Sequence, residues 1–98
     1  MQFLIRAWDG AGMLGKRLEV RPKHLENLAK VEGRILCAGG LLDEAGNMKG
    51  SVLVMEFEGR EGLEKYLASE PYIREGVWEK VEVEDMNVVL LNGEKVGK

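Results

Sequence analysis

The single histidine of the chain, His24, lies where two arginines would be its neighbours on a helix. At about 100° per residue, the steps of four and three residues that separate Arg17, Arg21 and His24 return to nearly the same side of the helix. An imidazole can exchange a proton near neutral pH, and a guanidinium can hold an anionic group with parallel hydrogen bonds. This stretch is therefore the first candidate for proton-transfer chemistry.

The helix that would carry these residues has an apolar sector beside them, formed by Leu14, Leu18 and Leu25. The spacing predicts that this leucine stripe is buried and that His24 lies at its edge. Pro22 lacks the amide donor and disfavours a helical conformation at the residue before it. The sequence therefore predicts a short helix over 12–20 and a second helix that starts at Pro22.

Length and composition indicate a single domain over residues 1–98, with a polar tail from about residue 92. The hydrophobic content of 45% and charged content of 32% are typical of globular chains, and no apolar run approaches the roughly 18 residues that cross a bilayer. Because the first residues carry no signal-peptide pattern and the chain has a single cysteine, we expect a cytoplasmic protein with no membrane partner.

The same composition argues against two further classes. One cysteine and one histidine are too few for a zinc site, and no phosphate-binding loop or nucleotide fingerprint occurs, so we expect neither a metal nor a cofactor. A net charge of −3 with mixed signs disfavours nucleic acid. The order of elements also occurs in the RNA recognition motif, but the aromatic residues that stack bases there are missing.

Hydrophobic periodicity predicts the order β-α-β-β-α-β. The expected strands cover 3–8, 34–42, 49–58 and 77–84, the helical region before the second strand extends to about residue 32, and a short helix covers 60–69. Right-handed crossovers close this order into a ferredoxin-like α+β fold, a four-stranded antiparallel sheet with both helices on one face. Since the first three strands carry apolar residues on both sides, we expect a homodimer that packs through the open sheet faces.

Several short motifs then occur in a characteristic order: Arg17, Arg21-Pro-Lys-His-Leu25, Ala38-Gly39, Gly50-Ser51, Glu70-Pro-Tyr72 and Gly76-Val77. In this order and spacing the chain resembles the YCII-related domain family over most of its length, to about Val83. The resemblance implies a dimeric α+β barrel and an active site that pairs a histidine with an aspartate. For most members of this family the reaction is unassigned. His24 matches the histidine, and Glu70 stands at the aspartate position.

A carboxylate next to a proline at a helix end is also well placed to orient an imidazole and to stabilise it when it takes up a proton. We therefore expect His24 and Glu70 to be catalytic residues. Arg17, Arg21, Ser51 and Tyr72 are the candidates for binding the substrate, the arginines because they can hold an anionic group.

These residues predict a cofactor-free enzyme of the lyase, isomerase or hydrolase type, in which the His24–Glu70 pair is general acid and base for a small organic substrate that can carry negative charge. A non-catalytic small-ligand-binding or regulatory dimer that uses the same pocket is the alternative. A third interpretation makes His24 an ordinary surface residue, since histidine is intermediate in burial.

Overall fold

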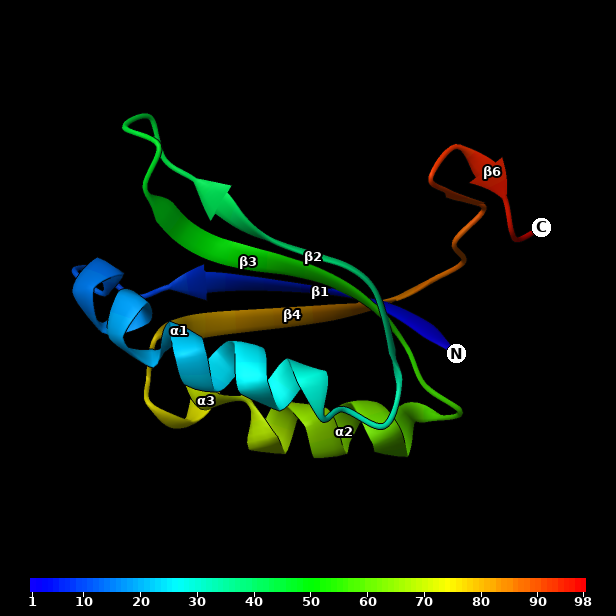
Figure 1. Cartoon of the computed structure of the whole chain (residues 1–98), viewed down its shortest axis with the longest axis horizontal. Helices are drawn as coiled ribbons and strands as arrows, with labels where there is room; N and C mark the ends of the chain where they lie inside the picture. The colour runs from blue at the N-terminus through cyan, green and yellow to red at the C-terminus, as the bar shows by residue number, and fades with distance from the viewer.

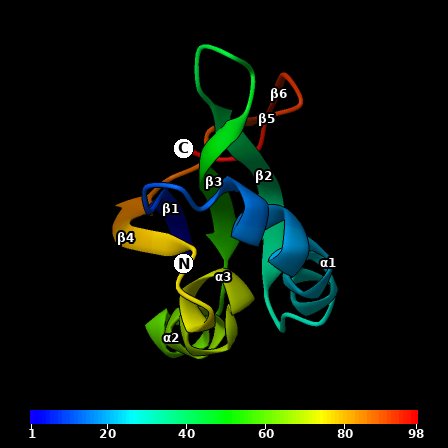
Figure 2. The same cartoon turned by 90° about the vertical axis from the view of Figure 1, so that its left-hand side faces the viewer.

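The computed structural model describes residues 1–98 and confirms the predicted ferredoxin-like α+β fold (Figure 1). The strands of the main sheet are antiparallel in the order β2-β3-β1-β4, and the three helices lie on one side of it (Figure 2). The elements are β1 Gln2–Asp9, α1 Leu14–Ala29, β2 Arg34–Leu42, β3 Met48–Glu56, α2 Arg60–Ser69, α3 Pro71–Arg74, β4 Trp78–Met86, β5 Leu90–Leu91 and β6 Glu94–Lys95.

The core lies between the sheet and the helices, and β1 is central to it. Its alternate residues Phe3, Ile5 and Ala7 are completely buried, as a half-buried strand with period two requires. Ile5 pairs with Leu53 of β3 and Val83 of β4, so three strands contribute apolar side chains to the same face. This packing fixes the register, because a shift by one residue would move the apolar side chains of β1 to the opposite face of the sheet.

The predicted break at Pro22 is wrong, since α1 continues through it from Leu14 to Ala29. The amide that proline lacks would bond the carbonyl of Leu18, four residues earlier. Pro22 is exposed and the Leu18 side chain is 55% exposed, so the missing hydrogen bond lies on the solvent side, where water can replace it. A helix that curves around a core tolerates an interruption there.

The prediction of a buried leucine stripe is also wrong. The buried residues of α1 are Arg17, Val20, His24 and Leu28, whereas Leu18 is 55% and Leu25 46% exposed. The helix therefore turns its basic and titratable side toward the sheet. Burying such groups is unfavourable unless each has a polar partner, so the rest of the fold has to supply those partners.

The junction between α2 and α3 supplies one of them. Pro71 begins α3 in the first helical turn, where proline is favoured, and Glu70 before it has an extended backbone. The Glu70 side chain caps this short helix by accepting from the amide of Tyr72 at 3.1 Å. This cap holds the carboxylate at a fixed place under α1.

The sheet face opposite the helices is uncovered. β1 and β3 present half-buried Leu4, Trp8 and Val52 there, while β4 presents exposed charged residues, Lys80, Glu82 and Glu84. The polar tail expected from about residue 92 contains the second strand of the β5–β6 hairpin, β6, and the first strand, β5, lies just before it. The hairpin lies on this same side of the sheet, away from the helices (Figures 1 and 2).

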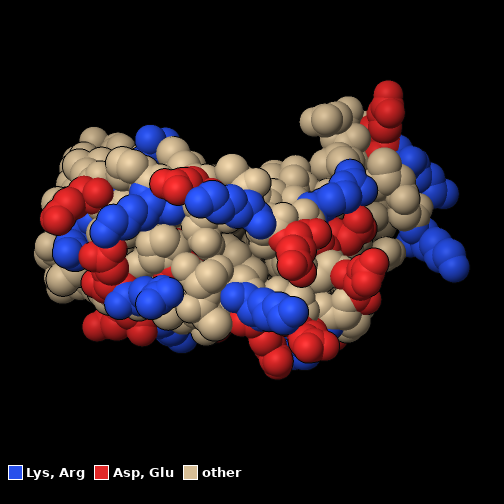
Figure 3. Space-filling model, turned by 60° about the horizontal axis from the view of Figure 1, so that its bottom comes forward, with Lys and Arg blue, Asp and Glu red and all other residues tan.

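The outer surface of the helical layer carries charges of both signs, interspersed without a large patch of either (Figure 3). Such a surface lacks the basic stripe that marks a phosphate-binding footprint. The longest helix is α1, and neither it nor any other helix combines the length and apolar character of a membrane span.

Candidate active site

A cavity of about 140 Å³ opens between α1, β2, β3 and the start of α3. Of the predicted site residues, Arg17, Arg21, His24, Ser51 and Tyr72 line it, and Glu70 lies directly behind His24. The structure thus brings all six together from three parts of the chain: α1, β3 and the start of α3. The remaining lining residues are mostly apolar or small: Leu25, Leu28, Ala38, Gly39, Gly40, Met48 and Leu53.

A short polar contact joins Nδ1 of His24 to Oε1 of Glu70, at 2.5 Å. His24 is 8% exposed and Glu70 is completely buried. Because Nδ1 is engaged by the carboxylate, Nε2 is the ring nitrogen that has no hydrogen-bond partner within the chain. A carboxylate in this position favours the proton on Nδ1, and Nε2 then has the free lone pair of a base.

Glu70 has a further partner that sequence reasoning missed, the hydroxyl of Tyr66, which donates to Oε2 at 2.5 Å. The spacing of four residues between Tyr66 and Glu70 was the available signal, since such pairs meet on one helix face. Burial raises the pKa of Tyr66 most, and the charge and the hydrogen bond of Glu70 raise it further. The pKa therefore lies well above its ordinary value, and the hydroxyl stays protonated.

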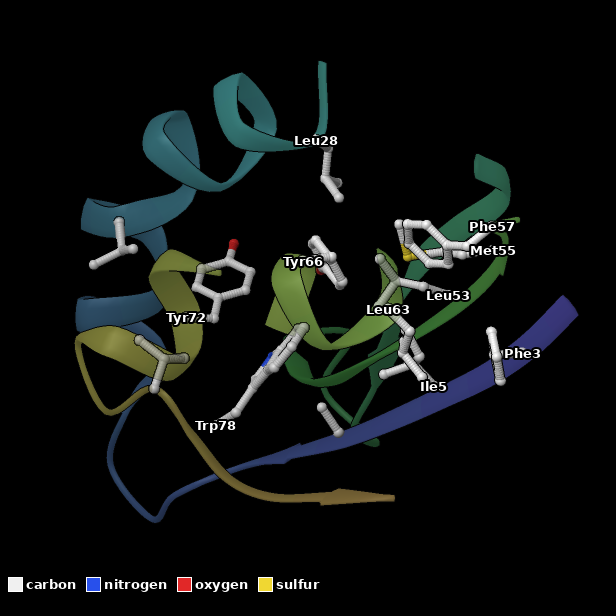
Figure 4. Close-up of a cluster of buried hydrophobic side chains, with 13 residues drawn as sticks. Phe3, Ile5, Leu28, Leu53, Met55, Phe57, Leu63, Tyr66, Tyr72 and Trp78 are labelled. Carbon is white, nitrogen blue, oxygen red and sulfur yellow. The ribbon is translucent and has the colours of Figure 1, made fainter. Parts of the chain in front are cut away.

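Aromatic rings hold the imidazole in place. The Tyr72 ring stacks on His24 with the ring centres 4.1 Å apart and the planes 20° apart. Trp78 meets His24 edge-on at 6.2 Å and lies close to Tyr72 (Figure 4). His24 therefore has little freedom to rotate, and a base that is already oriented loses less entropy when it reacts.

Arg17 has partners inside the protein. Its Nη1 donates to both carboxylate oxygens of Asp9, at 2.8 and 3.0 Å, and its Nη2 donates to the Ser51 hydroxyl at 2.7 Å. Its guanidinium also lies over the Tyr72 ring at 4.7 Å. Asp9 balances the charge of Arg17. Arg17 in turn holds the side chains of Ser51 and Tyr72 at the cavity wall. Sequence reasoning missed Asp9, because no local pattern pairs it with Arg17.

Arg21 is different, because it lines the cavity, is exposed and forms no ion pair within the chain. Its charge is thus free to meet a ligand. Tyr72 contributes a hydroxyl whose pKa is raised, chiefly by burial and in spite of Arg17 and Arg21, which lower it. Near neutral pH this hydroxyl remains a hydrogen-bond donor.

The cavity therefore combines one imidazole, one guanidinium without an ion pair and two hydroxyls with apolar lining residues. Such an arrangement can transfer a proton and bind an anion. His24, Glu70 and Asp9 do not converge on a common point. Nowhere in the chain do three or more His, Cys, Asp or Glu side chains gather as the ligands of a metal ion do.

Comparison with known families and proteins gives consistent results. The model of the YCII-related domain matches residues 1–87, which leaves the β5–β6 hairpin outside the match. The protein YciI of Escherichia coli is 38% identical over 97 residues, 91% of this chain and 99% of that protein. An uncharacterised protein of Haemophilus influenzae is 33% identical over the same shares of the two chains.

Among solved structures, the 5-chloro-2-hydroxyhydroquinone dehydrochlorinase of Burkholderia phenoliruptrix, in complex with 2,5-dihydroxybenzoquinone, superposes with a TM-score of 0.79 at 27% identity. The match covers 88% of this chain and 93% of that one. A putative antibiotic biosynthesis monooxygenase from Bacteroides thetaiotaomicron, at 13% identity, has a TM-score of 0.60 over 94% of this chain and 91% of its own and shares the fold.

Proposed function

We propose that this protein, which belongs to the YCII-related domain family, binds a small oxygen-bearing organic molecule in the His24 cavity and moves a proton to or from it. The buried 2.5 Å contact between His24 and Glu70 is the observation that supports this most strongly. A fully buried carboxylate is unfavourable unless it is well paired, and here its partner is the one imidazole that lines the cavity. His24 is the general base, and Glu70 orients it and stabilises its protonated form.

The cavity suits a ligand about the size of one six-membered ring. Its volume of about 140 Å³ is close to that of an engineered cavity, roughly 150 Å³, that binds benzene. The cavity lining offers the apolar side chains Leu28, Leu53 and Met48 for the faces of such a ring, and the polar side chains Arg21, Ser51 and Tyr72 for oxygen atoms at its edge. We therefore assign the ligand to small cyclic molecules with acidic hydroxyl or carboxylate groups.

The dehydrochlorinase neighbour suggests the first compounds to test. Its bound molecule, 2,5-dihydroxybenzoquinone, is a flat ring with acidic hydroxyls, and its named reaction removes hydrogen chloride. In this chain His24 would accept, as a proton, the hydrogen that is lost with chlorine, and the electron pair of that bond would form the new double bond. The carbon–chlorine bond then breaks, and its electron pair leaves on chloride. The two measurements are calorimetric titration with 2,5-dihydroxybenzoquinone and chloride release from 5-chloro-2-hydroxyhydroquinone.

Arg21 should control the affinity for an anionic ligand. We expect Arg21→Ala to raise the dissociation constant for 2,5-dihydroxybenzoquinone about tenfold, because a hydrogen bond to a charged group contributes about 1.5–3 kcal/mol. Arg60→Ala is the matched control, since Arg60 is an exposed arginine on α2 that does not line the cavity. Equal affinity in wild type and the Arg21 variant would remove Arg21 from the site.

We also propose that two copies pack through their open sheet faces. Leu4, Trp8 and Val52 there are only half-buried, and pairing the faces would remove this apolar surface from water. Light scattering at micromolar concentration should then give twice the chain mass of 10.9 kDa.

Val52→Asp should convert this dimer to a monomer, because a dimer would bury the carboxylate without a partner. Leu18→Asp is the control, since it places the same charge on the outer side of α1, where Leu18 is 55% exposed. A wild-type protein that scatters as a monomer would contradict the dimer.

A further inference from the structure

Glu70 is the most deeply buried acidic residue of the chain, with no exposed surface, and its two oxygens have different partners. Oε1 meets Nδ1 of His24 at 2.5 Å and accepts from the Tyr72 amide at 3.1 Å. Oε2 accepts from one donor in the chain, the hydroxyl of Tyr66, at 2.5 Å. The carboxylate thus depends on Tyr66 for the whole of its second oxygen.

Tyr66 acts without reaching the ligand site. It is 2% exposed and lies in the core against the other helical residues, and it does not line the His24 cavity. Figure 4 shows its ring between Leu28 of α1 and the sheet, apart from Tyr72. Any effect of its hydroxyl on the chemistry of His24 must therefore pass through Glu70.

We propose that Tyr66 is a positioning residue: by donating to Oε2 it keeps Glu70 ionised and its Oε1 directed at His24, and it thereby decides which imidazole nitrogen carries the proton. The inference rests on the proposed function, in which Nε2 is the base. A carboxylate buried in this way stays charged only while its lone pairs are satisfied by donors. The hydrogen bond to Tyr66 is one of the three that do this.

The consequence of losing the hydroxyl follows from proton balance. Without Tyr66 Oη, the charge on the carboxylate is buried with no donor at Oε2, and the pair removes this charge by taking up one proton from solvent on the carboxyl group. Neutral Glu70 then donates from Oε1 to Nδ1, so Nδ1 becomes the acceptor and the imidazole proton moves to Nε2. Nε2 would then no longer be a base.

The test uses the fact that His24 is the only histidine. The measurement is the ¹⁵N spectrum of histidine-labelled protein at neutral pH. We expect Nδ1 of His24 to be protonated in wild type and unprotonated in Tyr66→Phe. The loss of one buried hydrogen bond should change the ratio of the two tautomers at least roughly tenfold. Tyr72→Phe is the matched control. It removes a hydroxyl from an equally buried tyrosine but keeps the amide that bonds Glu70, so Nδ1 of His24 should stay protonated.

A merely structural role for Tyr66 would lower the melting temperature of Tyr66→Phe and leave the protonation of Nδ1 unchanged, and that result would overturn the inference. A second measurement does not depend on the variant folding. With two tyrosines in the chain, selective labelling should reveal a slowly exchanging Tyr66 hydroxyl proton far downfield in wild type. Its absence would likewise contradict the hydrogen bond.

These spectra are recorded on the resting protein and need no substrate. Suppose that Tyr66→Phe moves the imidazole proton, but the wild-type protein binds neither 2,5-dihydroxybenzoquinone nor 5-chloro-2-hydroxyhydroquinone. The role of Tyr66 then stands and the proposed function fails. If the probe binds and the proton does not move, the proposed function stands and Tyr66 is a packing residue. The two proposals therefore fail independently.

Discussion

Glu70→Ala is expected to lower the free energy of unfolding by about 3–5 kcal/mol, the loss typical when one partner of a buried charged pair is removed. Three donors lose their acceptor at once: Nδ1 of His24, the Tyr66 hydroxyl and the Tyr72 amide. The α3 helix also loses its cap. In a chain of this size the melting temperature should fall by more than about 12 °C, measured by circular dichroism.

Glu70→Asp is the matched variant, because it keeps the charge and shortens the side chain by one methylene. Aspartate is a preferred N-cap residue and can still accept from the Tyr72 amide. It would lose the contact with Tyr66, so we expect a smaller destabilisation of about 1–2 kcal/mol. Equal losses for alanine and aspartate would show that the whole network requires the longer side chain.

His24→Asn is expected to reduce turnover of 5-chloro-2-hydroxyhydroquinone by roughly 10²–10⁴-fold, the usual contribution of a general base. The asparagine amide can replace Nδ1–H as a donor to Glu70, so the fold should persist, but it has no basic nitrogen for the cavity. His24→Ala should lose the same activity and also stability, because it leaves Glu70 without that donor. Chloride release and thermal melting measure the two effects separately.

Each outcome of that experiment distinguishes between the candidate functions. Full activity in His24→Asn would show that His24 holds the fold and performs no chemistry. A wild-type protein that binds 2,5-dihydroxybenzoquinone but releases no chloride would favour the non-catalytic ligand-binding protein that the sequence leaves open.

Much of the fold could be read from local patterns. Phe3, Ile5 and Ala7 alternate with less buried residues, and a strand with this pattern can bury only one face. The β-α-β-β-α-β order then leaves few topologies, since right-handed crossovers exclude the others. The α3 helix was missed, because four residues are too few for a periodic signal.

Part of the site was also predictable. Arg17, Arg21 and His24 were placed together from helix geometry alone, and Glu70 was named from the motif around Pro71. The role of each arginine was not predictable from the sequence. Arg17 is bound by Asp9 from the end of β1, and Arg21 forms no ion pair, although the two have the same residue type and lie one helical turn apart.

The residue types and spacing by themselves determined that one imidazole, two guanidiniums and a carboxylate would be available, and that an antiparallel sheet would carry them. Only the tertiary structure decided that α1 turns His24 and Arg17 inward while Leu18 and Leu25 remain exposed. The physical reason is that the burial of a polar side chain depends on partners distant in sequence, here Asp9, Ser51 and Glu70. Hydrophobic periodicity ranks faces by apolar content, and it does not register hydrogen bonds that form only when distant segments meet.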